Sequence, residues 1–141
     1  MRINLKIGRQ LISSNHKPVV YDDKSEDEVT ARGRIQSMDN AVQTFFAELN
    51  RLPIDQSEID PYTDFSPTSN YTYSFTYLHT GICYMQATTS YSTLHSFTLT
   101  ESFYNGYPES IVCKKNTPGT PPSNVSDYNS TLSCHLDATQ N

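Results

Sequence analysis

Histidine and cysteine are the side chains of this sequence that could bind a transition metal. The candidates in its second half are His79, Cys83, His95, Cys113, Cys134 and His135. None of them forms a CxxC, HxxxH or HExxH spacing, which are the spacings that bring two ligands to one metal ion. Cys134 and His135 are neighbours, so in a strand their side chains would point to opposite faces. The sequence therefore predicts no metal site and no cofactor.

A reactive thiol is the next possibility, because cysteine paired with histidine can act as a nucleophile. Cys83 lies between His79 and His95, and neighbouring antiparallel strands could bring one of these rings to the thiol. The opposing interpretation places Cys83 in a hydrophobic core beside Met85. No GxSxG or other catalytic signature occurs. We therefore predict no catalytic residue, and a small cysteine-dependent enzyme remains only a second alternative.

Aromatic side chains are the most distinctive feature of the second half. Tyr or Phe occupies 13 of the 81 positions after residue 60. Tyrosine has an apolar ring, a polar tip and few rotamers, which suits protein interfaces and sugar stacking. The candidate partner-binding residues are Tyr71, Tyr73, Phe75, Tyr77, Tyr91, Tyr104 and Tyr107. The first four alternate along one strand, so they form either a partner surface or the inner face of a sheet, which is the reading we favour. Their opposite face carries Ser and Thr and almost no charge, as expected of a face covered by a partner.

The redox compartment is left open by the cysteines. Three cysteines allow one disulfide and a free thiol, as in a secreted protein, or three buried thiols in a reducing compartment. Three sequons begin at Asn70, Asn124 and Asn129, and these would be glycosylated only if the chain is secreted. The sequence contains no run of seven apolar residues, so we predict no signal peptide and favour a cytoplasmic or virion-associated location.

Composition and charge exclude several classes of protein. The 141 residues carry a net charge of −5 with 10 basic side chains, so nucleic acid is an unlikely partner. The absence of a long apolar run predicts no membrane span. We interpret the chain as a single domain, 1–141. It divides into a charged half (1–52), a connection rich in proline and acids (53–69), a β half rich in Tyr, Ser and Thr (70–136) and a frayed tail (137–141).

One helix and several strands are needed to position these side chains. Apolar residues at three- and four-residue steps predict a helix from Ser37, as its cap, to about Arg51. The stripe consists of Met38, Ala41, Val42, Phe45, Leu49 and Leu52. Before it, alternation predicts strands at 3–7 and 29–35 and a short strand at 19–21. A helix capped at Ser25 is the alternative for residues 29–35.

The second half predicts a meander of antiparallel strands. Alternating residues and turn signals place strands at 71–77, 82–87 and 96–103, with turns at Gly81 and Asn105-Gly106. Shorter strands are expected at 111–113 and 132–136. The predicted fold class is α+β, an antiparallel sheet packed by one amphipathic helix, with a β-sandwich carrying one helix as the alternative.

The function expected from these features is protein–protein association by a non-enzymatic structural or accessory protein, for instance a component of a virion or phage. Self-association is included in this expectation. The alternative is a secreted, glycosylated recognition domain that binds a host protein or carbohydrate.

Overall fold

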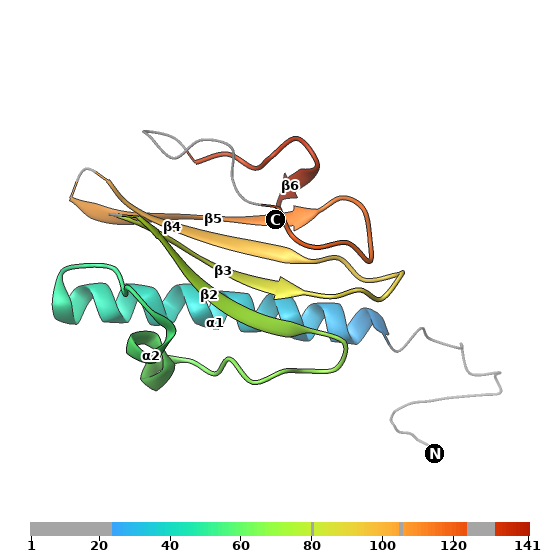
Figure 1. The fold of residues 1–141 in the computed structure, drawn as a ribbon, viewed down its shortest axis with the longest axis horizontal. Helices are drawn as coiled ribbons and strands as arrows, with labels where there is room; N and C mark the ends of the chain where they lie inside the picture. Colours follow the sequence, from blue (N-terminus) through green and yellow to red (C-terminus); the bar gives the residue numbers. More distant parts are fainter. Residues whose placement is uncertain (1–23, 80, 105, 124–131) are drawn as a thin grey trace, which may run out of the picture.

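A computed structural model describes residues 24–79, 81–104, 106–123 and 132–141 of the chain. A long helix comes first, followed by two short helical turns and five strands. The elements are α1 (Lys24–Leu49), α2 (Gln56–Ile59), η1 (Asp60–Tyr62), β2 (Thr72–His79), β3 (Ile82–Thr88), β4 (Phe97–Tyr104), β5 (Tyr107–Lys115) and β6 (Ala138–Gln140). The strands form one antiparallel sheet in the order β2-β3-β4-β5-β6, and α1 lies across one face of it (Figure 1). The α+β prediction is confirmed, and the sandwich alternative is wrong.

Helix α1 is longer than predicted, because residues 29–35 belong to it and not to a strand. Ala31 and Ile35 are fully buried, whereas Val29, which alternation would bury with them, is 72% exposed. The buried positions continue to Met38 and Val42 in steps of three and four, so they form one helical stripe. The helical alternative for this segment is therefore correct, but Ser25 is not the cap, because α1 already begins at Lys24. Ser37 is not a cap either, since the residue lies in the middle of α1 and its hydroxyl donates to Gly33 O.

The end of α1 was predicted within two residues. Asn50 follows the helix in the left-handed region, at φ 58°, and its amide donates to Phe46 O at 2.7 Å. This is a common way for a helix to terminate. Leu49, expected in the buried stripe, is 49% exposed because it lies on the last turn.

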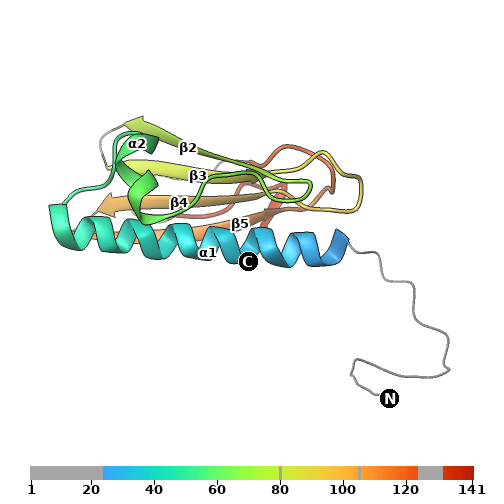
Figure 2. The same cartoon turned by 90° about the horizontal axis from the view of Figure 1, so that it is seen from below.

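The connection from 53 to 69 lies on the same side of the sheet as α1 and returns to the start of β2 (Figure 2). Ile59 and Phe65 from this connection are buried in the core. Arg34 of α1 holds it in place by donating to the backbone oxygens of Asp64 (2.8 Å) and Ser66 (2.9 Å).

The core lies between α1 and the sheet face that it covers. Strand β3 contributes Cys83, Met85 and Ala87, and β4 contributes Phe97 and Leu99, all buried. Gly81 and Gly106, with φ of 82° and 92°, lie in the two hairpin turns that the sequence predicted.

The opposite sheet face is covered in part by the chain itself. Residues 132–137 lie on this side, away from α1 (Figure 1), whereas β6 pairs with β5 and Asn141 contacts Arg32 of α1. Ser96 Oγ donates to Thr120 O at 2.8 Å, and a disulfide joins Cys113 of β5 to Cys134. The strand predicted at 132–136 is wrong, because the last strand, β6, begins only at Ala138. The frayed tail is also wrong, since β6 is paired with β5. The strands predicted at 3–7 and 19–21 lie outside the described residues.

Candidate functional site

The aromatic residues of the predicted partner surface lie mainly on the face that α1 covers. Tyr71 and Tyr73 are buried, and Phe75 and Tyr77 are partly buried against the core. The Tyr71 hydroxyl donates to His95 O at 2.7 Å, and the Tyr73 hydroxyl is 2.6 Å from Thr68 Oγ1. These residues therefore have structural partners of their own, which leaves little of Tyr71 and Tyr73 for another protein to contact.

The other predicted surface residues are dispersed. Tyr91 is 39% exposed in the connection between β3 and β4. Tyr104 and Tyr107 pair across the β4–β5 hairpin, but the structure does not describe their side chains. Asn70 is exposed just before β2, whereas Asn124 and Asn129 lie outside the described residues.

Strand β2 forms one edge of the sheet. Its sequence, TYSFTYLH, contains no Asp, Glu, Lys, Arg or Pro, and among the described residues only β3 pairs with it. Thr72 and Ser74 are exposed on the face opposite α1, and Leu78 is 38% exposed. An edge strand of this length usually carries lysine, proline or a bulge that prevents pairing with another chain. Here the register shift between Tyr77 and His79, at the hairpin end, is the one such feature.

Cys83 does not form the thiol site that was considered. It is fully buried and lies opposite Glu101 of β4, and burial together with the Glu101 carboxyl raises the pKa of the thiol. A raised pKa disfavours the nucleophilic thiolate. His95 lies six residues before Glu101, which corresponds to about 20 Å along an extended chain. The thiol and the His95 ring are therefore not brought together.

Glu101 is a buried acid that the sequence analysis missed. Its exposed fraction is 0%, and burial, followed by the hydrogen bond and charge of Asp39 on α1, raises its pKa well above the ordinary value. As carboxylates, Glu101 and Asp39 could not donate to each other, and Glu101 Oε1 and Oε2 would lack donors. A proton on Glu101 would give this pair of carboxyl groups a donor. Its place between Leu99 and Phe103 in an alternating strand was a signal that could have revealed it.

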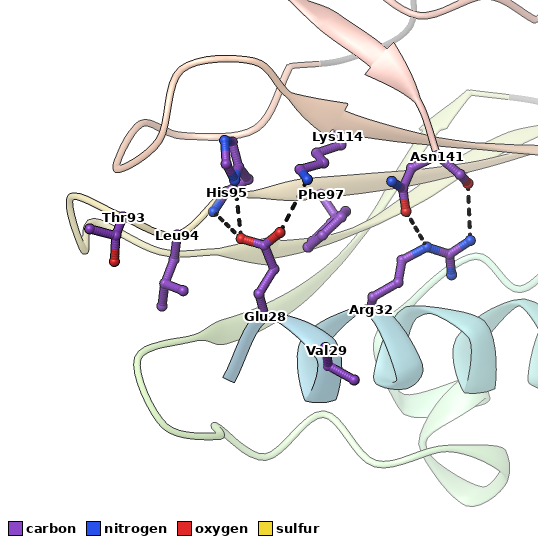
Figure 3. Close-up of a pocket in the computed structure, with 9 residues that line it drawn as sticks. All are labelled: Glu28, Val29, Arg32, Thr93, Leu94, His95, Phe97, Lys114 and Asn141. Carbon is purple, nitrogen blue, oxygen red and sulfur yellow. Dashed lines mark hydrogen bonds and ion pairs between the residues drawn. The ribbon is translucent and has the colours of Figure 1, made fainter. Parts of the chain in front are cut away.

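A pocket of about 520 Å³ lies where the first turns of α1 meet the sheet (Figure 3). Glu28 and Arg32 project from α1, Lys114 comes from β5, and the connection before β4 contributes His95. The remaining lining residues are Val29, Thr93, Leu94, Phe97 and Asn141. Residues far apart in the sequence line this pocket, so no local pattern indicated it before the fold was known.

Hydrogen bonds fix the charged groups of the pocket. Glu28 Oε1 accepts from the His95 amide at 3.0 Å and lies 3.0 Å from His95 Nδ1, while Glu28 Oε2 lies 3.2 Å from Lys114 Nζ. Burial disfavours the ionised form of Glu28, but the hydrogen bonds from His95 and Lys114 outweigh it and lower its pKa. Arg32 donates from Nε to Asn141 Oδ1 (2.8 Å) and from Nη2 to Asn141 O (3.0 Å).

Neither a metal-binding cluster nor a membrane-spanning helix is found in the part of the chain that the structure describes. Within it, no three His, Cys, Asp or Glu side chains cluster in a way that could hold a metal ion. None of the helices described is both long and apolar enough to cross a bilayer.

Comparison with known proteins returns no match: no family model, curated protein or solved structure is significantly similar to this chain.

Proposed function

We propose that this chain is a non-enzymatic protein that works by protein–protein association, and that β2 is the contact strand. The observation that carries the proposal is the uncharged, proline-free edge of β2, which no described strand other than β3 pairs with. An added strand would gain main-chain hydrogen bonds along this edge. A virion or other assembly component would use such a surface to contact its neighbours.

The occupant that we propose is β2 of a second copy. A strand without Asp, Glu, Lys or Arg can meet itself in antiparallel pairing with no repulsion between such charges directly opposite each other. Two-fold pairing of identical strands gives a closed dimer. In antiparallel pairing along the whole strand, the exposed Thr72 and Ser74 of each copy would lie at opposite ends of the contact.

Lysines on β2 test this proposal. Thr72→Lys with Ser74→Lys places two positive charges at exposed positions of the edge strand, where they oppose pairing. The matched control is Gln43→Lys with Ala47→Lys on the exposed side of α1. Sedimentation velocity at protein concentrations of about 10 to 100 µM should give a dimer for the wild type and the control. The β2 variant should be a monomer with an unchanged circular dichroism spectrum.

Two results would overturn the proposal. One is a wild-type monomer throughout this concentration range. The other is association of the β2 variant to the same extent as the control, which would place the contact elsewhere.

A secreted recognition domain is the second candidate, and the Cys113–Cys134 disulfide favours it. Disulfides persist in oxidising compartments and are rare in the cytosol. Asn70 of the first sequon is exposed and could carry a glycan. The mass of the protein from its native source decides this point, because a glycan adds mass and the bare chain has 16.0 kDa. A bare mass would exclude the glycosylated candidate.

A further inference from the structure

We propose that the pocket between α1 and the sheet binds a small apolar molecule that carries a carboxylate. Its volume of about 520 Å³ lies within the range of about 300 to 1,000 Å³ that is typical of small-molecule sites. Such sites combine an apolar lining with a few fixed polar groups. No residue of β2 lines the pocket, so this proposal does not depend on the one above.

The apolar lining comes from three residues. Leu94 and Phe97 are each 1% exposed, so they close the floor of the pocket while exposing little surface of their own. Val29 is 72% exposed on the rim, and contact with an apolar ligand would remove its apolar surface from water, which is favourable. Figure 3 shows the Phe97 ring between Glu28 and Arg32, below Lys114.

The charges of the pocket favour an anion. Arg32 and Lys114 contribute two positive charges, and Glu28 contributes one negative charge, in a chain whose formal net charge is −5. A ligand cation would meet both basic groups. Arginine and lysine form their strong charge-assisted hydrogen bonds with carboxylates and phosphates. A phosphate would bring more negative charge toward Glu28, so the single charge of a carboxylate fits better.

The basic groups are also held in place before any ligand arrives. Asn141 fixes Arg32 through two hydrogen bonds, and Glu28 fixes Lys114. A site whose side chains are already ordered loses less conformational entropy on binding. With its carboxylate between Arg32 and Lys114, the ligand would have its apolar part over Leu94 and Phe97.

Binding of 1-naphthoate tests the proposal, with 1-naphthalenemethanol as the neutral probe of similar shape. By calorimetry or NMR titration of the full chain, we expect a Kd for 1-naphthoate below about 1 mM, as for an efficient ligand of this size. The alcohol should bind about tenfold more weakly, since it lacks a charged acceptor.

Two variants place the site. Lys114→Met should weaken naphthoate binding by about fivefold or more while leaving binding of the alcohol nearly unchanged. Val29→Glu puts a negative charge on the exposed rim without disturbing the core, and should also weaken naphthoate binding. Gln36→Glu, exposed further along α1, is the matched control and should bind like the wild type. Equal affinity for the two probes, no measurable naphthoate binding, or full affinity in both pocket variants would each overturn the proposal.

Discussion

Replacing the buried acid Glu101 by glutamine should stabilise the protein at neutral pH. Glu101→Gln keeps the size and shape of the side chain, and its amide can donate to Asp39 as the protonated carboxyl does. The wild-type side chain is fully buried on β4, where burial and Asp39 raise its pKa well above the ordinary value. We therefore expect the native state to hold a proton that the unfolded chain releases above the ordinary glutamate pKa of about 4.3.

The sign and size of the effect follow from proton linkage. Where the native state binds one more proton than the unfolded state, the free energy of unfolding falls by about 1.4 kcal/mol for each pH unit. While native Glu101 keeps its proton, wild-type stability should fall by about 2.5 kcal/mol between pH 5 and pH 7 relative to the glutamine variant. At pH 3.5, where the unfolded glutamate is also mostly protonated, the two proteins should differ little in this respect.

Urea unfolding at pH 3.5, 5, 6 and 7, followed by circular dichroism, measures this difference. The control is Glu26→Gln, which removes an exposed carboxyl from the first turn of α1 and should leave the pH dependence like that of the wild type. Parallel stability curves for wild type and Glu101→Gln between pH 5 and pH 7 would refute the reasoning. They would mean that Glu101 is ionised in the native state.

Four further predictions concern glycines and cysteines. Gly33 lies on the exposed side of α1 with open space around it, so Gly33→Ala should raise the unfolding free energy by about 0.5 to 1 kcal/mol. Gly119→Ala should lower the unfolding free energy, because φ is +74° there and a Cβ would lie 3.2 Å from Ser92 Cα. Chemical denaturation measures both effects, and a gain in stability at position 119 would contradict the geometry. Reduction of Cys113–Cys134 should cost about 3 kcal/mol for a separation of 21 residues, measured by unfolding with and without dithiothreitol. Buried Cys83 should react with iodoacetamide only when the chain unfolds, and fast labelling of the native protein would revive the thiol hypothesis.

Local patterns predicted the meander and the second half of α1. Hairpin strands pair with their sequence neighbours, and Gly81 and Gly106 mark the turns, so short windows of sequence contain what is needed. The first half of α1 was missed because Ala31 and Ile35 are four residues apart, a spacing that fits both a strand face and a helix face. The contact that distinguishes the two is distant: Glu28 meets His95 across 67 residues.

The candidate site depended even more on such distant contacts. Arg32 reaches Asn141 across 109 residues, and Lys114 meets Glu28 only because β5 lies beside α1. No spacing rule connects these residues, so the sequence could not place them in one pocket. The exposed hydroxyl face of β2, by contrast, follows from period-two alternation alone, and its lack of charge was visible before the fold.

Reduction of the disulfide can separate two ways in which the hydroxyl-rich face could be used for association. On β4, Thr98 and Thr100 are at most 1% exposed, and the neighbouring strand β5 is linked through Cys113–Cys134 to the segment that follows it. On β2, Thr72 and Ser74 are exposed with the disulfide intact. Association through β2 should therefore be unchanged by dithiothreitol, under conditions where circular dichroism shows that the sheet is retained. Association through β4 would require the segment after β5 to leave the sheet face. A dimer that forms only after reduction would therefore show that the contact lies on the β4 face and not at the β2 edge.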